Sequence, residues 1–152
     1  MNIAPGSDSF PPAAAEIEAA CRGKLHPMAL MGMALFNQKA FWKAHEALEE
    51  AWKLEPGPVR HLYRGILQVG VTYFHLERGN YAGGMKMYVR SQRWLAPFPD
   101  ICRGIDVARL RADLQRVVAE AKRLGPERLE LFDQTLFKPI HYTPSTKEAG
   151  HR

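Results

Sequence analysis

The sequence predicts an all-α fold, a compact helical bundle of about five helices built from antiparallel helix pairs. Three observations support this prediction. Apolar residues recur at intervals of three and four along most of the chain, which is the spacing of one helix face. Proline and glycine separate these segments, most clearly at Pro56-Gly57-Pro58. No pair of alternating segments in the 152 residues indicates neighbouring strands.

The first half of the chain contains three expected helices. Pro11-Pro12 is placed to begin a short helix over residues 13–22. Pro27 opens a second helix over residues 27–36, whose wide apolar surface predicts burial. After a short turn, a third helix is expected over residues 40–54.

The second half repeats this alternation of helices and breaks. A long helix is expected over residues 58–78, with the Gly79-Asn80 turn at its end. Another follows over residues 81–95, before two prolines that a helix interior does not tolerate. The last long helix, over residues 106–124, carries a regular apolar stripe. A short turn and an extended segment over residues 137–142 complete the expected domain.

A weak internal repeat supports helix pairs as the building unit. At an offset of 40 residues, Phe41 matches Tyr81 and Ala44 matches Gly84. Small residues at such positions let a neighbouring helix approach closely. The arrangement resembles two tetratricopeptide-like hairpins without that repeat's full signature. Two repeats favour a compact bundle over an open solenoid.

The length predicts one domain, over residues 11–143, between a disordered N-terminal tail (1–10) and a mobile C-terminal tail (144–152). No apolar run approaches the roughly 18 to 20 residues that a membrane span needs, and the N-terminus shows no secretory signal. Cys21 and Cys102 form no CxxC pair. We therefore expect a reduced, cytoplasmic protein with two buried free thiols.

The net charge of +5 arises mainly in the second half of the chain. Acidic residues interrupt the basic ones there, and Arg109, Asp113, Arg116 and Glu120 follow one another at intervals of four, three and four. That alternation is typical of a solvated, ion-paired helix face. An adaptor that binds acidic partners or RNA through this arginine-rich half is an alternative function, but nucleic-acid binding is disfavoured.

Polar residues among core positions indicate a candidate site. His45, Glu49 and Trp52 lie at i, i+4 and i+7 of the helix over residues 40–54. Gln68 and His75 share one stripe of the next helix. Because a short turn joins the two helices, they should pack antiparallel, so that His45, Glu49 and Gln68 converge and His75 lies further along.

Two hypotheses for these five residues involve no catalysis. They line a polar groove between the helices that binds a small ligand or a protein partner, with Trp52, Tyr63 and Tyr73 as its walls. Alternatively they are a buried structural network, in which Glu49 and Gln68 hold His45 by hydrogen bonds. Both hypotheses predict no cofactor, and catalytic activity is disfavoured.

A metal-dependent hydrolase is the enzymatic alternative. His45-Glu46 begins like the zinc-binding HExxH helix, but Glu49 stands where that motif has its second histidine. His45, Glu49 and His75 could supply three ligands to a divalent ion, with Glu46 as a less favoured base. The distance along the helices makes joint coordination difficult, so these residues are only weak metal candidates.

The same residues resemble the DUF309 family of small helical proteins. The family pattern is F-N-x-x-x-F/Y-x-x-A-H-E-x-L-E-x-x-W, followed by G-x-x-Q and H-x-x-x-G-N, and the resemblance extends over residues 34–95. It is carried by Phe36-Asn37, Phe41, Ala44-His45-Glu46, Leu48-Glu49, Trp52, Gly65, Gln68, His75 and Gly79-Asn80. The resemblance implies an all-α bundle and assigns no activity, cofactor or catalytic residue.

Overall fold

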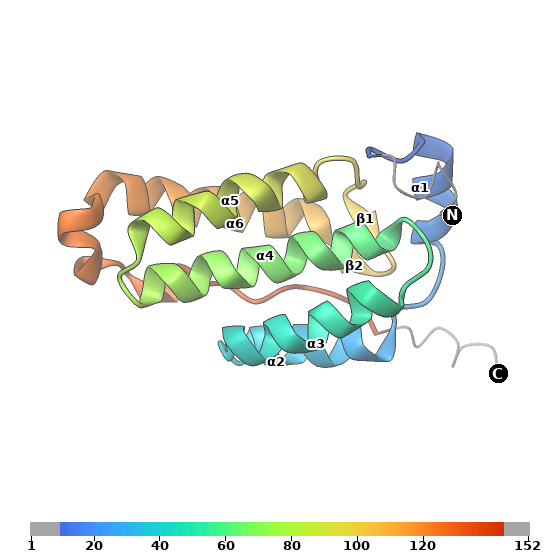
Figure 1. The fold of residues 1–152 in the computed structure, drawn as a ribbon, viewed down its shortest axis with the longest axis horizontal. Coiled ribbons are helices and arrows are strands. Elements are labelled where there is room, and N and C mark those ends of the chain that lie inside the picture. Colours follow the sequence, from blue (N-terminus) through green and yellow to red (C-terminus); the bar gives the residue numbers. More distant parts are fainter. Residues whose placement is uncertain (1–9, 145–152) are drawn as a thin grey trace.

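The 19-residue helix α4 (Val59–Glu77) runs through the middle of the structure, and the other long helices pack around it (Figure 1). The computed structural model describes residues 10–144. Within these residues the fold is an all-α bundle, which confirms the predicted class. The predicted tails lie outside the described residues except for Phe10 and Pro144, and the ring of Phe10 packs edge-on against Trp94 at 4.7 Å.

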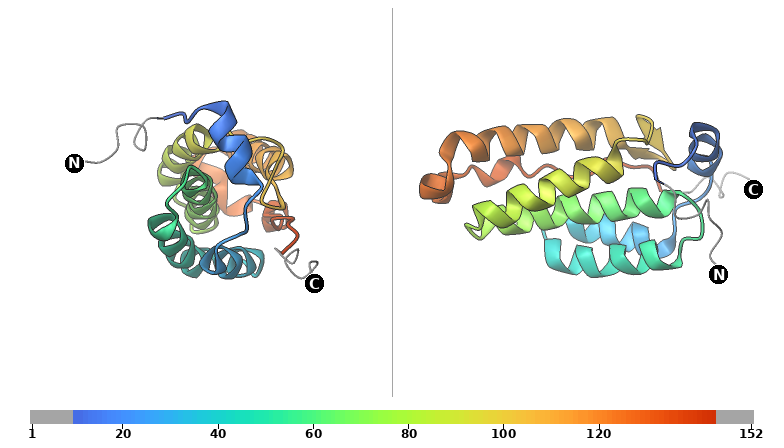
Figure 2. Two further views of the ribbon diagram at one scale, coloured as in Figure 1. Left: turned by 90° about the vertical axis from the view of Figure 1, so that its right-hand side faces the viewer. Right: turned by 45° about the horizontal axis from the view of Figure 1, so that its top comes forward.

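The helices agree with the predicted ranges to within a residue or two at each end. Besides α4, the bundle comprises α1 (Ala14–Cys21), α2 (Pro27–Asn37), α3 (Phe41–Leu54), α5 (Tyr81–Leu95) and α6 (Val107–Leu124). Two 3-10 segments, η2 (Pro126–Leu131) and η3 (Gln134–Leu136), follow α6. Two views along and across the bundle show α1 at one end of it (Figure 2).

One small sheet corrects the expectation of a strand-free chain. The strands β1 (Ile101–Cys102) and β2 (Ile105–Asp106) form an antiparallel hairpin. Each strand has only two residues, which is too short to show an alternating pattern. Gly104 has a φ of 80°, in the left-handed region that glycine adopts readily, and it allows the tight turn between them.

Helices α2 to α5 pack as successive antiparallel pairs, because short turns join them. Small residues occur where α4 and α5 approach each other. A Cβ atom at Gly84 would lie 2.7 Å from the side chain of Leu76, and one at Gly65 would lie 2.8 Å from Leu95. The small residue that the internal repeat places at position 84 is therefore needed for close helix packing.

An aromatic cluster fills the core between α2, α3, α4 and the C-terminal segment. Phe41 lies 5.3 Å from Phe36, 5.5 Å from Tyr73 and 5.7 Å from Phe137, measured between ring centroids. Burial raises the pKa of Tyr73, so its hydroxyl stays protonated. The segment after η3 returns along the bundle (Figure 1), where the side chain of Asn37 both donates to and accepts from the backbone of Ile140.

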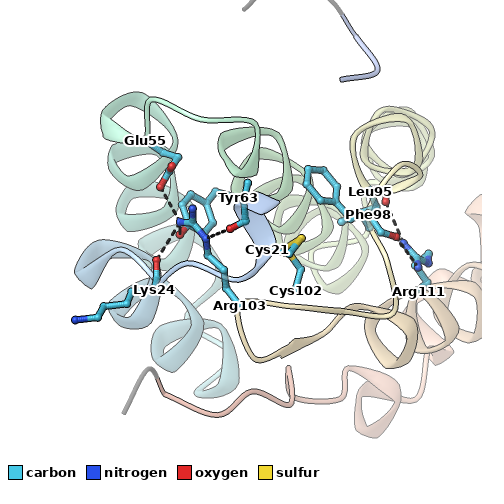
Figure 3. The surroundings of a disulfide bond; sticks show 10 residues. Cys21, Lys24, Glu55, Tyr63, Leu95, Phe98, Cys102, Arg103 and Arg111 are labelled. Atoms are coloured by element: carbon cyan, nitrogen blue, oxygen red, sulfur yellow. Dashed lines mark hydrogen bonds and ion pairs between the residues drawn. A yellow bond between two sulfur atoms is a disulfide. The ribbon is translucent and has the colours of Figure 1, made fainter. Parts of the chain in front are cut away.

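Cys21 and Cys102 form a disulfide, so the expectation of two free thiols is wrong (Figure 3). The cysteines are 81 residues apart in sequence, and only the folded arrangement brings the end of α1 against β1. Disulfides persist mainly in oxidising compartments, so the inference from reduced thiols to the cytoplasm loses its basis. Between residues 10 and 144, no helix is both long enough and apolar enough to cross a membrane.

Arg103 lies beside this disulfide and joins several parts of the chain (Figure 3). Its Nε donates to the carbonyl of Ala20 at 2.8 Å, and its Nη1 lies 3.0 Å from the carbonyl of Lys24. The same Nη1 lies 2.9 Å from a carboxylate oxygen of Glu55 and 3.2 Å from the hydroxyl of Tyr63. Because the side chains of Arg103 and Glu55 are each only 10% exposed, this ion pair is almost fully desolvated.

Candidate ligand-binding cleft

A cleft of about 320 Å³ lies between α3 and α4, with α5 at its edge. Helix α3 supplies side chains at intervals of three and four residues, so they share one face. The matching face of α4 supplies the other wall. The lining residues are Trp42, His45, Glu49 and Trp52 from α3, Arg64, Leu67, Gln68, Val71 and His75 from α4, and Met87 from α5.

The structure brings all five residues of the candidate site to this one cleft. His45, Glu49 and Trp52 lie on the α3 side, and Gln68 and His75 lie on the α4 side. Glu49 is at the rim, because its side chain is 39% exposed and lies 4.0 Å from the ammonium group of Lys53.

Two polar atoms of the cleft are buried and lack a hydrogen-bond partner. They are Nδ1 of His45 and Oε1 of Gln68. Within residues 10–144, no hydrogen bond joins His45, Glu49 and Gln68 to one another. The His45 ring instead stacks on Trp42, with 4.6 Å between the ring centroids. A buried polar atom without a partner costs about 1 to 3 kcal/mol, so a ligand that hydrogen-bonds to these two atoms would recover that energy.

His75 has a defined hydrogen bond at the far end of the cleft. Its Nδ1 lies 3.2 Å from the side-chain nitrogen of Asn80. The oxygen of that amide accepts from the backbone N–H of Gly83 at 2.9 Å, which fixes its orientation. The amide therefore donates to Nδ1, and the neutral ring carries its proton on Nε2. Burial lowers the pKa of His75, which also favours the neutral ring.

Arg64 lies between two tryptophan rings. The central carbon of its guanidinium group is 4.5 Å from the ring centroid of Trp52 and 4.1 Å from that of Trp94. Burial, and then the nearby positive charge of Arg93, lower the pKa of Arg64. Among the described residues, the guanidinium group of Arg64 makes neither a hydrogen bond nor an ion pair.

The structure does not provide the ligand set that the hydrolase alternative requires. No three histidine, cysteine, aspartate or glutamate side chains in the described part of the chain are close enough to hold one metal ion. His45, Glu49 and His75 share the cleft but do not form such a group.

The expected aromatic walls are wrong in part. Tyr63 and Tyr73 are fully buried, and neither lines the cleft. Tyr63 instead accepts hydrogen bonds from the backbone of His26 and from Arg103. Tyr63 is next to the cleft residue Arg64, and Tyr73 is two residues from Val71 and from His75. Because successive residues of a helix point about 100° apart, both tyrosines point away from the cleft.

Sequence reasoning missed Arg64, which lies one helical turn before Gln68 on the same face of α4. The four-residue spacing between Arg64 and Gln68 was the sequence signal that could have placed Arg64 in the cleft. A lone arginine on a helix is usually solvated, however, and its aromatic partner Trp94 comes from α5. The aromatic residues on both sides of Arg64 were visible only once α3, α4 and α5 were placed together.

Five of the residues that carry the family resemblance have a structural role that the fold explains. Phe36 and Phe41 are in the core, Asn37 holds the C-terminal segment, Gly65 allows close packing of α5, and Asn80 caps α5. The remaining motif residues include five that line the cleft, namely His45, Glu49, Trp52, Gln68 and His75.

Some arginines of the arginine-rich second half make contacts within the chain. Arg109 lies 3.6 Å from Asp113, and Arg123 pairs with Glu120 at 2.7 Å. Arg111 donates to the backbone carbonyls of Leu95 and Phe98 (Figure 3). The expected ion-paired helix face is therefore met only in part, because Asp113 is buried and not solvated, and Glu120 pairs with Arg123 and not with Arg116.

Comparison with known proteins supports the family resemblance. Residues 30–87 match the family model described as a domain of unknown function (DUF309), which confirms the resemblance. A protein of Aquifex aeolicus (strain VF5), described as an uncharacterized protein, is 29% identical over 96 residues. That alignment covers 62% of this chain and 29% of the relative, so the chain spans under a third of the relative's length. Helices α3 and α4, which form the two walls of the cleft, lie inside the family match.

Proposed function

We propose that this DUF309-like domain is a binding protein, and that the cleft between α3, α4 and α5 holds a small organic ligand without catalysing its conversion. The two unpartnered polar atoms, Nδ1 of His45 and Oε1 of Gln68, carry this proposal. Both belong to residues that line the same cleft. A bound molecule with its own hydrogen-bonding groups could pair with both atoms and so remove the free-energy cost of leaving each one buried without a partner.

The size and composition of the cleft support a small ligand. Its volume of about 320 Å³ lies at the lower end of the range for small-molecule sites. Trp42, Trp52, Leu67 and Val71 offer apolar surface, and a few polar groups lie among them. Apolar walls with a small number of polar groups are typical of sites that bind organic molecules.

Binding can be measured through the tryptophans, because the chain has only three: Trp42 and Trp52 line the cleft, and Trp94 stacks on Arg64. We expect the neutral probe benzamide, which can both donate and accept a hydrogen bond, to shift the indole N–H signals of Trp42 and Trp52 in ¹H–¹⁵N NMR spectra. The shifts should saturate as the benzamide concentration rises.

A matched pair of variants locates the binding. Val71→Phe places a larger side chain at the cleft wall and should weaken benzamide binding by about tenfold or more, a loss of about 1.4 kcal/mol. Val89→Phe makes the same change on α5 at a residue that is 63% exposed and outside the cleft, and it should leave binding unchanged. Indole signals that stay unchanged with benzamide and with its anionic analogues benzoate and phenyl phosphate, or equal binding by both variants, would rule out the proposed site.

A further inference from the structure

We infer that the ligand of this cleft is an anion, and that a carboxylate or phosphate group binds to the N–H edge of Arg64. This inference depends on the proposed function, since it identifies the chemical class of the ligand for the same cleft. It is based on how the guanidinium group is held and on which of its donors remain unused.

Two tryptophan rings pack against the Arg64 guanidinium group, whereas its N–H donors are not engaged. Trp52 and Trp94 lie within 4.5 Å of its central carbon, each measured to the ring centroid. Stacking between aromatic rings restricts the long arginine side chain to few conformations. All five N–H donors of a guanidinium group lie in its plane, and none of them has a partner within residues 10–144.

Arg64 differs in this respect from the four described arginines that lie beside a carboxylate. A carboxylate oxygen lies within 3.6 Å of a guanidinium nitrogen in each of them: Arg103, Arg109, Arg111 and Arg123. Arg64 has no such partner, and its charged neighbour is the positive Arg93, whose guanidinium lies 5.0 Å from the Trp94 ring. The acid that lines the cleft, Glu49, lies beside Lys53 instead. An anion at Arg64 would therefore compensate two neighbouring positive charges.

The planar arrangement favours an oxyanion over other anions. Arginine binds carboxylate and phosphate groups through two parallel hydrogen bonds, and each is stronger than a hydrogen bond between neutral groups. Gln68 lies one helical turn from Arg64 on the same face of α4, and His45 faces it from α3. These two residues are placed to bind the part of the ligand next to its anionic group.

The test compares three probes of similar size by isothermal titration calorimetry: benzoate, phenyl phosphate and neutral benzamide. We expect at least one of the two anions to bind the protein about tenfold more tightly than benzamide. The anion that binds more tightly identifies the preferred group as carboxylate or phosphate. Added sodium chloride should weaken anion binding more than benzamide binding.

Variants assign this preference to Arg64. Arg64→Leu should remove the preference for the anion over benzamide, and Arg64→Lys should retain only part of the preference because lysine lacks the planar pair of donors. Arg78→Leu is the matched control, since Arg78 stacks on Phe74 outside the cleft. This variant should prefer the anion over benzamide as strongly as the unmodified protein does.

Each failure has its own pattern. If benzamide binds as tightly as both anions, or if Arg64→Lys and Arg64→Leu both keep the full anion preference, the inference is wrong while the proposed function stands. If none of the three probes shifts the signals of cleft residues, the proposed function is wrong as well.

Discussion

Replacing Arg103 with alanine is expected to lower the free energy of unfolding by about 3 to 5 kcal/mol. The substitution leaves the carboxylate of Glu55, whose side chain is 10% exposed, without its partner. It also removes the hydrogen bonds to the carbonyls of Ala20 and Lys24, which attach the N-terminal helices to the hairpin. Urea denaturation of the oxidised protein measures this loss.

Arg123→Ala is the matched control for this result. Its ion pair with Glu120 is solvated, with the arginine side chain 65% exposed, so its loss should change stability by less than about 1 kcal/mol. If the two variants were equally stable, the contacts of Arg103 would not have the stabilising role that the structure gives them.

Removing the disulfide should have a comparably large effect. The double substitution Cys21→Ala and Cys102→Ala is expected to lower the free energy of unfolding by about 4 kcal/mol, because a loop of 81 residues is no longer closed in the unfolded chain. A reducing agent should destabilise the unmodified protein by a similar amount and leave the double variant unaffected.

Mass spectrometry with and without alkylation verifies the oxidation state before these measurements. The prediction fails if the protein has its disulfide intact and a reductant breaks it without any change in stability. Cys102 is fully buried, so the reduction should be performed under partly denaturing conditions and the protein then returned to native buffer.

Helix positions could be predicted because their signals are local. Pro27 and Gly79-Asn80 mark boundaries within a few residues of where the chain turns, and the apolar period is continuous between such points. The disulfide could not be predicted, since no local pattern links Cys21 to Cys102. The two-residue strands of the hairpin are likewise defined by their partners and not by their composition.

The cleft could be predicted in part, because the helices that form its walls and the turn between them have local sequence signals. The short turn between α3 and α4 fixes their antiparallel packing, which brings His45 and Gln68 to a common cleft. Whether those side chains form a hydrogen bond with each other depends on their exact distance and orientation, which the sequence does not contain. The stacking of Arg64 on Trp94 additionally requires the position of α5.

The most direct test of the account is a crystal structure of the protein in the presence of saturating benzoate. We predict benzoate in the cleft between α3 and α4, with its carboxylate oxygens about 2.8 Å from the guanidinium nitrogens of Arg64. We also predict that the ligand, directly or through water, approaches the side chains of His45 and Gln68. A structure in which benzoate occupies another surface while the cleft stays free of it would contradict the account.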